Sequence, residues 1–258
     1  RRFGSINWIG AWTLYKKEVL RFLNVWIQTI FSPLISALLF LLVLSLAIGA
    51  DKGNVLGVPF INFLAPGLVA MQIIQQSFSH SASSFMIGKI QGNIVDILYA
   101  PLSAGEVTIA ITLAAVTRSI MIAFILICIF HLIIDFEIKN YFTLIAYTFL
   151  SSFILGALGI IAGLWAEKFD HMATVTNFII VPLSFLSGTF YTIDKLPGYL
   201  YIISKANPFF YMIDGFRYSF IGQSDGSLMV GLIYLVILSF IIWMTAYLLY
   251  KKGYKIKS

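Results

Sequence analysis

The sequence predicts an all-α integral membrane protein with six transmembrane helices, an N-terminal interfacial amphipathic helix and a re-entrant helical pair before the last span. Of its 258 residues, 60% are hydrophobic and only 11% are charged, whereas a soluble domain carries roughly 25% charged residues. Apolar runs of about 20 residues recur along the chain, and each is long enough to cross a hydrocarbon core of about 30 Å. The runs are continuous rather than alternating, which favours helices over the strands of a barrel.

Six apolar runs define the predicted spans, which are 25–49, 60–87, 107–134, 141–166, 172–191 and 228–250. Pro33 and Pro182 fall inside two of them, and membrane helices tolerate proline with a kink. The fourth run carries Gly159 and Gly163 at a spacing typical of close helix packing. No gap between runs is long enough for a soluble domain, so residues 1–258 are predicted to form a single transmembrane domain.

The segment 5–23, before the first run, is amphipathic. Trp8, Trp12 and Tyr15 recur at spacings of three and four residues, while Lys17 and Arg21 fall on another side. This pattern predicts a helix lying in the membrane interface. The alternative is an ordinary N-terminal tail.

The distribution of basic residues predicts the orientation. With the N-terminus inside, the cytoplasmic segments hold Arg1, Arg2, Lys16, Lys17, Arg21, Lys89, Lys168, Lys251, Lys252, Lys255 and Lys257. The outer segments hold only Lys52, Lys139, Lys195, Lys205 and Arg217. Because positive charge accumulates on the cytoplasmic side, both termini are predicted to be cytoplasmic, which agrees with an even number of spans.

The segment 192–224, between the last two spans, is rich in aromatic residues and contains Pro197 and Pro208. It is too apolar for a solvated loop and too broken for a span. A short re-entrant or interfacial pair of helices fits best. The alternative is an outer loop that lies flat on the membrane.

The sequence predicts no catalytic, metal or cofactor site. Gly88-Lys89 is followed by Ile90 and lacks the glycine and Ser/Thr spacing of a P-loop. His80, His131 and His171 are far apart and lack the spacing of metal ligands. The net charge of +6 resides in short loops, where membrane orientation explains it and no nucleic-acid partner is needed.

Polar residues inside the predicted spans are informative, because intramembrane polarity is costly. One helical face of the second span carries Gln72, Gln76, Ser79 and Ser83. Such a face either lines a translocation path or holds helices together by hydrogen bonds. Arg118 lies about 16 Å into the third span. It must face a cavity, a partner or thinned bilayer, so we group it with the same candidate path.

The cytoplasmic segment 88–106 combines a short helical pattern with exposed apolar residues. Ile94, Ile97 and Leu98 lie at steps of three and four residues, so a short helix could present them as one face. Pro101 would end that helix. Apolar surface outside the membrane usually marks a contact, so this face either docks on a partner or lies against the membrane interface.

Three stretches resemble conserved motifs of ABC-2 type permeases, the membrane subunits of ABC exporters. They are Lys89-Ile-Gln-Gly-Asn-Ile-Val-Asp-Ile-Leu-Tyr-Ala-Pro-Leu-Ser, Pro182-Leu-Ser-Phe-Leu-Ser-Gly-Thr-Phe-Tyr, and Leu196-Pro197 followed by Asn207-Pro208-Phe-Phe-Tyr-Met-Ile-Asp-Gly-Phe-Arg. They occur in the family's order, and the chain is most similar to the small six-span bacterial branch. In the first stretch the family's acidic residue would fall at Val95, whereas here it is Asp96, and Asn93 replaces the usual threonine.

The resemblance implies a permease subunit of a bacterial inner (cytoplasmic) membrane exporter that has no ATPase site of its own. Two copies of a separate ATPase would bind ATP and Mg, and a second permease copy would complete the complex. The implied ATPase-coupling residues are Gly92, Asn93, Ile94, Asp96, Ile97, Leu98 and Pro101. The implied outer re-entrant motif comprises Gly188, Pro197, Asn207, Pro208, Asp214 and Arg217. The aromatic content favours an amphipathic or hydrophobic substrate, although lipid contact explains the same aromatics.

Two other classes compete with this interpretation. A secondary transporter or channel that works without an ATPase is typified by inverted repeats and paired carboxylates in midspan, and neither is visible in the sequence. A membrane-embedded enzyme or assembly factor needs a convergent polar constellation, which the sequence does not show either. Copurification with an ATP-hydrolysing subunit distinguishes the three classes.

Overall fold

The computed structural model describes residues 6–134 and 137–256, without the side chains of residues 48–52, and its elements are almost entirely helical. Arg1, Arg2 and Lys257 lie outside the described residues, as does the side chain of Lys52. The strands in the described part are β1 (Asn54–Val55) and β2 (Val58–Pro59), which form a small antiparallel hairpin. The predicted all-α class is therefore confirmed.

The helices follow the predicted runs closely. They are α1 (Trp8–Asn24), α2 (Ser32–Lys52), α3 (Phe60–Ile90), α4 (Ile94–Tyr99), α5 (Ala104–Ile133), α6 (Tyr141–Trp165), α7 (Phe169–Val175), α8 (Val181–Leu186), α9 (Gly198–Ala206), α10 (Pro208–Ile221) and α11 (Leu228–Lys251), with a 3₁₀ turn at Ile193–Lys195. Two π-helical turns, Ile27–Phe31 and Thr176–Ile180, lie just before Pro33 and Pro182. A proline lacks the N–H that continues the α-helical ladder, so the preceding turn widens at both prolines.

Five helical segments of the described chain are long and apolar enough to cross a membrane: Ile27–Ala47, Ala104–Ile133, Tyr141–Trp165, Phe169–Leu186 and Leu228–Lys251. The predicted second span, α3, is not among them although it has 31 residues. Most of α3 is buried against α2, α5, α6 and α10. A helix enclosed by other helices can carry polar side chains that would be costly against lipid, because its neighbours satisfy them.

The packing of α6 on α3 depends on the two glycines that the sequence singled out. A Cβ atom at Gly159 would lie 2.5 Å from the carbonyl oxygen of Phe78, and one at Gly163 would lie 2.8 Å from that of Ala82. Neither position has room for a side chain. The predicted close packing of the fourth run is confirmed, and its partner is α3.

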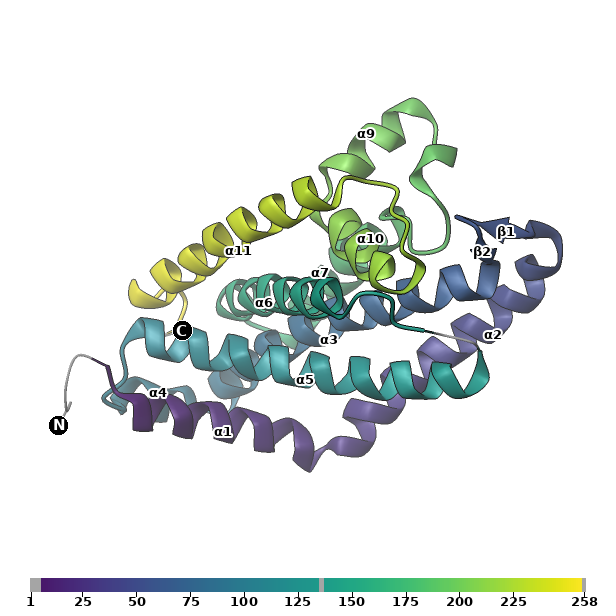
Figure 1. Cartoon of the computed structure of the whole chain (residues 1–258). Helices are drawn as coiled ribbons and strands as arrows, with labels where there is room; N and C mark the ends of the chain where they lie inside the picture. The colour runs from purple at the N-terminus through teal and green to yellow at the C-terminus, as the bar shows by residue number, and fades with distance from the viewer. Residues whose placement is uncertain (1–5, 135–136, 257–258) are drawn as a thin grey trace.

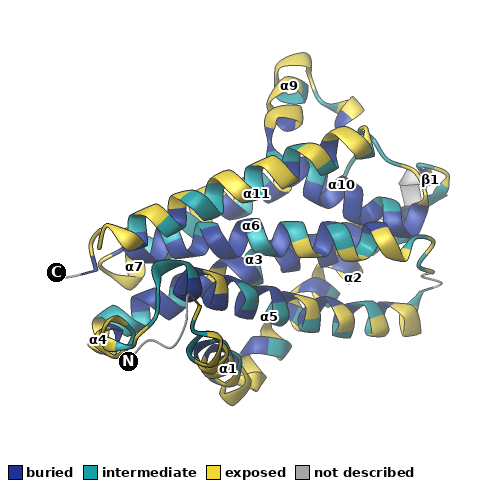
Figure 2. Cartoon of the chain, turned by 60° about the vertical axis from the view of Figure 1, so that its left-hand side comes forward, coloured by how far each residue is buried: buried dark blue, intermediate teal, exposed yellow. Residues whose placement is uncertain are grey.

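The ends of α3, α5 and α6 gather into two groups at opposite ends of the bundle (Figure 1). At one end, which we call the α4 end, Asn7 hydrogen-bonds to Pro101, Lys89 to Leu164, and Lys255 to Glu167. At the other, the α9 end, the hairpin lies near Gln223, which follows α10, and the side chain of Lys139, which precedes α6, donates to the Ile221 carbonyl at 2.7 Å. Figure 2 shows that buried residues follow α3 and α10, whereas much of α11 is exposed.

Candidate functional site

The segment that contains α4 is shaped by backbone geometry at both of its ends. Gly92 has a φ of 76°, a left-handed conformation that favours glycine, and Asn93 then precedes the first turn of α4. After Pro101, α5 begins with a capping box in which the Ser103 hydroxyl accepts from the Glu106 N–H at 3.3 Å and the Glu106 carboxylate accepts from the Ser103 N–H at 2.6 Å. The other oxygen of Glu106 accepts from the backbone N–H of Asn7 at 2.7 Å. This hydrogen bond joins the start of α1 to the start of α5.

The apolar residues of α4 do not all face outward. Ile94 is buried among residues of α1, α3 and α5, and Ile97 packs partly against the same cluster. The prediction that Ile94, Ile97 and Leu98 form one exposed face is therefore wrong. Ile94 and Ile97 face the bundle, and buried Ile94 anchors α4 to it. The outward-facing apolar residues are Val95, Leu98 and Tyr99, which we call the α4 patch; Leu98 is 40% exposed and Tyr99 is 87% exposed.

A buried polar cluster, which sequence analysis missed, joins α1 to α3. Glu18 is only 2% exposed, and its Oε2 atom accepts hydrogen bonds from Arg21 Nε at 2.9 Å and Ser84 Oγ at 2.8 Å. Arg21 also donates to the His80 carbonyl at 3.1 Å. The sequence signal was the spacing of four residues that places Glu18 between Leu14 and Phe22, both buried, on one face of α1.

The candidate path residues are brought together only in part. Arg118 Nη2 donates to Gln76 Oε1 at 2.6 Å, which joins α5 to α3. Ser83 accepts from Arg21 at 3.4 Å, Gln72 is buried, and Ser79 is exposed. Both interpretations of this face, a path lining and a contact between helices, stay predictions.

Arg217 of the outer motif joins α10 to the turn after α8 and to α3 at the α9 end. It is 1% exposed, its Nη2 donates to the carbonyls of Gly188 and Thr189 at 2.7 and 3.2 Å, and its Cζ lies 3.9 Å from the centroid of the Phe63 ring. Gly188 has a φ of 76°. A Cβ at Gly67 would lie 2.7 Å from the Thr189 carbonyl oxygen, so glycine there lets this turn approach α3.

The remaining residues of the outer motif cap helices and close a loop. Asn207 caps α10 and donates to Ser187 Oγ at 2.7 Å; Pro208 is the first residue of α10, and Pro197 precedes α9. Asp214 accepts from the backbone N–H groups of Asp225 and Gly226, each at 2.9 Å. Burial raises the pKa of Asp214 to about 6, against the opposing effect of these hydrogen bonds and Arg217.

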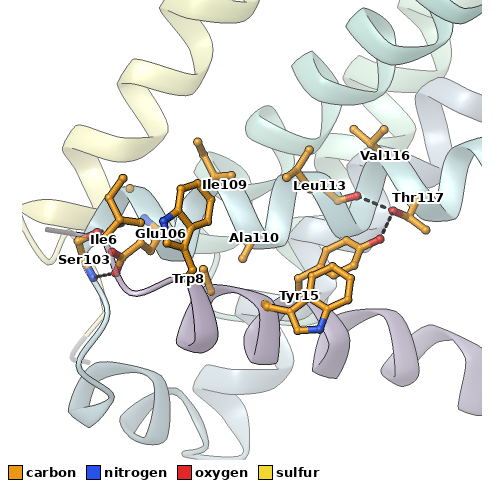
Figure 3. A pocket seen from close by; sticks show the side chains of 13 residues that line it. Ile6, Trp8, Tyr15, Ser103, Glu106, Ile109, Ala110, Leu113, Val116 and Thr117 are labelled. Carbon is orange, nitrogen blue, oxygen red and sulfur yellow. Dashed lines mark hydrogen bonds between the residues drawn. The ribbon is translucent and has the colours of Figure 1, made fainter. Parts of the chain in front are cut away.

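A groove of about 630 Å³ separates α1 from the first half of α5 (Figure 3). Trp8, Trp12 and Tyr15 line one wall, with Ile109 and Leu113 opposite. The Tyr15 hydroxyl and the Thr117 hydroxyl lie 2.7 Å apart and close one end, and the hydrogen-bonded Glu106 closes the other. Its walls are apolar and these polar groups are paired, so the groove offers no catalytic group. Nor does any cluster of three potential ligands for a metal occur within residues 6–134 and 137–256.

Comparison with known proteins places this architecture in a family. Residues 10–221 match the family described as ABC-2 type transporter. The inner membrane transport permease YadH of Escherichia coli (strain K12) is 28% identical over 253 residues, which cover 98% of this chain and 99% of the relative. Nodulation protein J of Rhizobium leguminosarum bv. viciae is 25% identical over 230 residues, covering 85% of this chain and 84% of that protein. The chain therefore belongs to the ABC-2 type transporter family and is a multi-pass transmembrane transport protein of the bacterial inner membrane.

Proposed function

We propose that this chain is the permease subunit of an exporter that moves an amphipathic or hydrophobic substrate across the inner membrane. A separate ATPase subunit binds ATP and Mg and hydrolyses the ATP, and two permeases assemble with two ATPases. Family membership supports the transport role. The observation that carries the ATPase assignment is the α4 patch, an apolar surface that projects from the end of the bundle where α1 begins and α11 ends.

The proposal includes six crossings of the membrane, namely the five segments described above and α3, which is the second in chain order. The chain reverses direction between α2 and α3, between α3 and α5, between α5 and α6, between α6 and α7, and between α8 and α11. By the positions of these helix ends, the reversals lie alternately at the α9 end and the α4 end. In this arrangement α1 lies in the membrane interface, and α9 with α10 forms the re-entrant pair of segment 192–224. The positive-inside distribution of Lys and Arg supports a cytoplasmic α4 end with both termini on that side.

The surroundings of the α4 patch suit the docking of a partner protein. Beside it lies a depression lined by residues of α4, α5 and the C-terminal segment, including Ile97, Leu98, Leu102, Tyr250 and Ile256. Contacts between a short helix and a groove depend on a few apolar anchors. On this chain the docked helix would transmit movement to α3 through buried Ile94. ATP would then shift the equilibrium between two permease states to the extent that the ATPase binds them differently.

Leu98→Asp is expected to weaken copurification of the ATPase about 10- to 100-fold and to abolish transport. The change removes an anchor worth about 1–3 kcal/mol and places a charge in an apolar contact. Membrane insertion should be unaffected, because no span is altered. Tyr199→Asp, an apolar-to-acidic change at a 68% exposed position of the α9 end, is the control and should leave the ATPase bound. If the ATPase stays bound to Leu98→Asp and substrate still moves, α4 is not the coupling element.

Single cysteines introduced after replacing Cys128 should report the orientation. Asn54→Cys, in the hairpin at the α9 end, should react with a membrane-impermeant thiol reagent added to intact cells whose outer membrane has been opened. Lys252→Cys, at the α4 end, should react only after the inner membrane is permeabilised. Both residues are exposed, so reactivity depends on sidedness. Labelling of Lys252→Cys with the inner membrane intact would reverse the proposed orientation.

A further inference from the structure

Arg118 carries a charge that no group in the described chain neutralises. Its Nη2 atom donates to the neutral amide oxygen of Gln76, and its buried Nε atom has no hydrogen-bond partner among the described residues. The ion pairs in residues 6–134 and 137–256 involve Glu18 and Glu167, and Arg118 takes part in neither. A largely buried guanidinium without a counter-charge is costly, and more so within a membrane span.

The neighbouring charged groups do not neutralise the positive charge of Arg118. The Glu18 carboxylate is bound to Arg21 at 2.9 Å, and Arg21 acts on Arg118 as a like charge. His80, fully buried beside them, has both ring nitrogens without a hydrogen-bond partner in the described structure, and its Nε2 lies 3.8 Å from Glu18. Arg21, Arg118 and the Glu18 carboxylate together carry one uncompensated positive charge. One anionic group bound at this cluster would neutralise it.

The surface of α3 gives access to this cluster. Gln76 and Arg118 are partly exposed, and Ser79, one turn along the same face of α3, is exposed. The Gln76 amide and the Ser79 hydroxyl add hydrogen-bond donors beside the guanidinium. On α5, Met121 and Ile125 lie three and seven residues beyond Arg118, so they share its side of the helix. Both are partly exposed, which places apolar surface next to the charged group.

We propose that Arg118, with Gln76 and Ser79, binds the anionic head group of an amphiphile whose apolar tail lies along Met121 and Ile125. Phosphate and carboxylate head groups both fit, because a guanidinium hydrogen-bonds either in the same planar manner. This deepens the proposed function: it assigns the exporter's substrate to the anionic amphiphiles and gives the Arg118 side chain the role of recognising the head group.

The test uses the purified permease in dodecyl maltoside and measures binding of dodecyl phosphate by titration calorimetry. Dodecyl phosphocholine supplies the same tail with no net charge, and inorganic phosphate supplies the anion without a tail. Wild-type protein should bind dodecyl phosphate at least about tenfold more tightly than either probe, and Arg118→Gln should lose at least about tenfold in affinity. Arg118→Lys, which keeps the charge, should retain part of the affinity. Lys17→Gln, at an exposed position on α1, should bind like the wild type.

Unchanged affinity of Arg118→Gln, or equal affinity of the wild type for dodecyl phosphocholine, would overturn the proposal. Equal affinity for inorganic phosphate would overturn the amphiphile assignment. If Arg118→Gln does not yield a monodisperse protein, the affinities of wild type and Arg118→Lys for the three probes still test whether the site prefers an anionic amphiphile. The measurement needs neither ATPase nor transport, so its failure leaves the ATPase assignment standing, and an ATPase that fails to copurify leaves the binding result standing.

Discussion

Replacing Gly215 with alanine is expected to destabilise the protein by about 3–5 kcal/mol, through overpacking and loss of a buried hydrogen bond. A Cβ atom at Gly215 would lie 2.0 Å from Cε1 of Tyr147. The ring cannot move aside freely, because Tyr147 is buried and its hydroxyl donates to the Leu228 carbonyl at 2.8 Å. Thermal unfolding of the purified protein in detergent should show a clearly lower midpoint.

Gly105→Ala is the matched control for that experiment. Its Cβ would come no closer than 3.8 Å to the atoms packed against α5, the nearest being on the Tyr247 ring. Alanine also has the higher helix propensity, by up to about 1 kcal/mol. The midpoint should stay the same or rise slightly. Tyr147→Leu combined with Gly215→Ala should cost less than the sum of the two single changes, since the shorter side chain relieves the overlap. Strictly additive losses would show that the ring is not what excludes a side chain at Gly215.

Glu18→Leu is expected to destabilise the attachment of α1 to α3 by about 2–4 kcal/mol. Removing one partner of a buried ion pair leaves the other charge uncompensated, and we place the effect toward the lower end because Arg21 is about a quarter exposed. The Ser84 hydroxyl also loses its acceptor. The expected readouts are a lower unfolding midpoint and protease cleavage within α1 under conditions where the wild type is resistant.

The double variant Glu18→Leu, Arg21→Met separates charge from packing. With both charged groups removed, the two apolar side chains should recover most of the lost stability. Glu18→Gln should fall between wild type and Glu18→Leu, because an amide keeps a hydrogen-bond acceptor for Arg21 and Ser84. A double variant that is less stable than Glu18→Leu alone would mean that Arg21 stabilises α1 independently of Glu18.

The sequence by itself determined the helices and the family. A continuous apolar run that crosses lipid must form a helix, because every backbone N–H and C=O group there needs a hydrogen-bond partner within the same segment. For this reason the bounds of α1, α5, α6 and α11, and those of α2 taken together with the π-helical turn Ile27–Phe31 before it, lie within a few residues of the predicted ones. The motifs around Pro101, Gly188 and Pro208 carried the resemblance, because the turns and helix starts at these positions require particular residues.

The tertiary structure alone decided which polar and apolar residues face one another. A spacing of three or four residues shows that Ile94 and Ile97 share a side of α4, but it does not show whether that side meets the bundle or a partner. Likewise, no local pattern places Glu18 against Ser84, 66 residues away, or Arg118 against Gln76. These pairs arise because α1, α3 and α5 pack together, and buried polar groups then take the partners that this packing supplies.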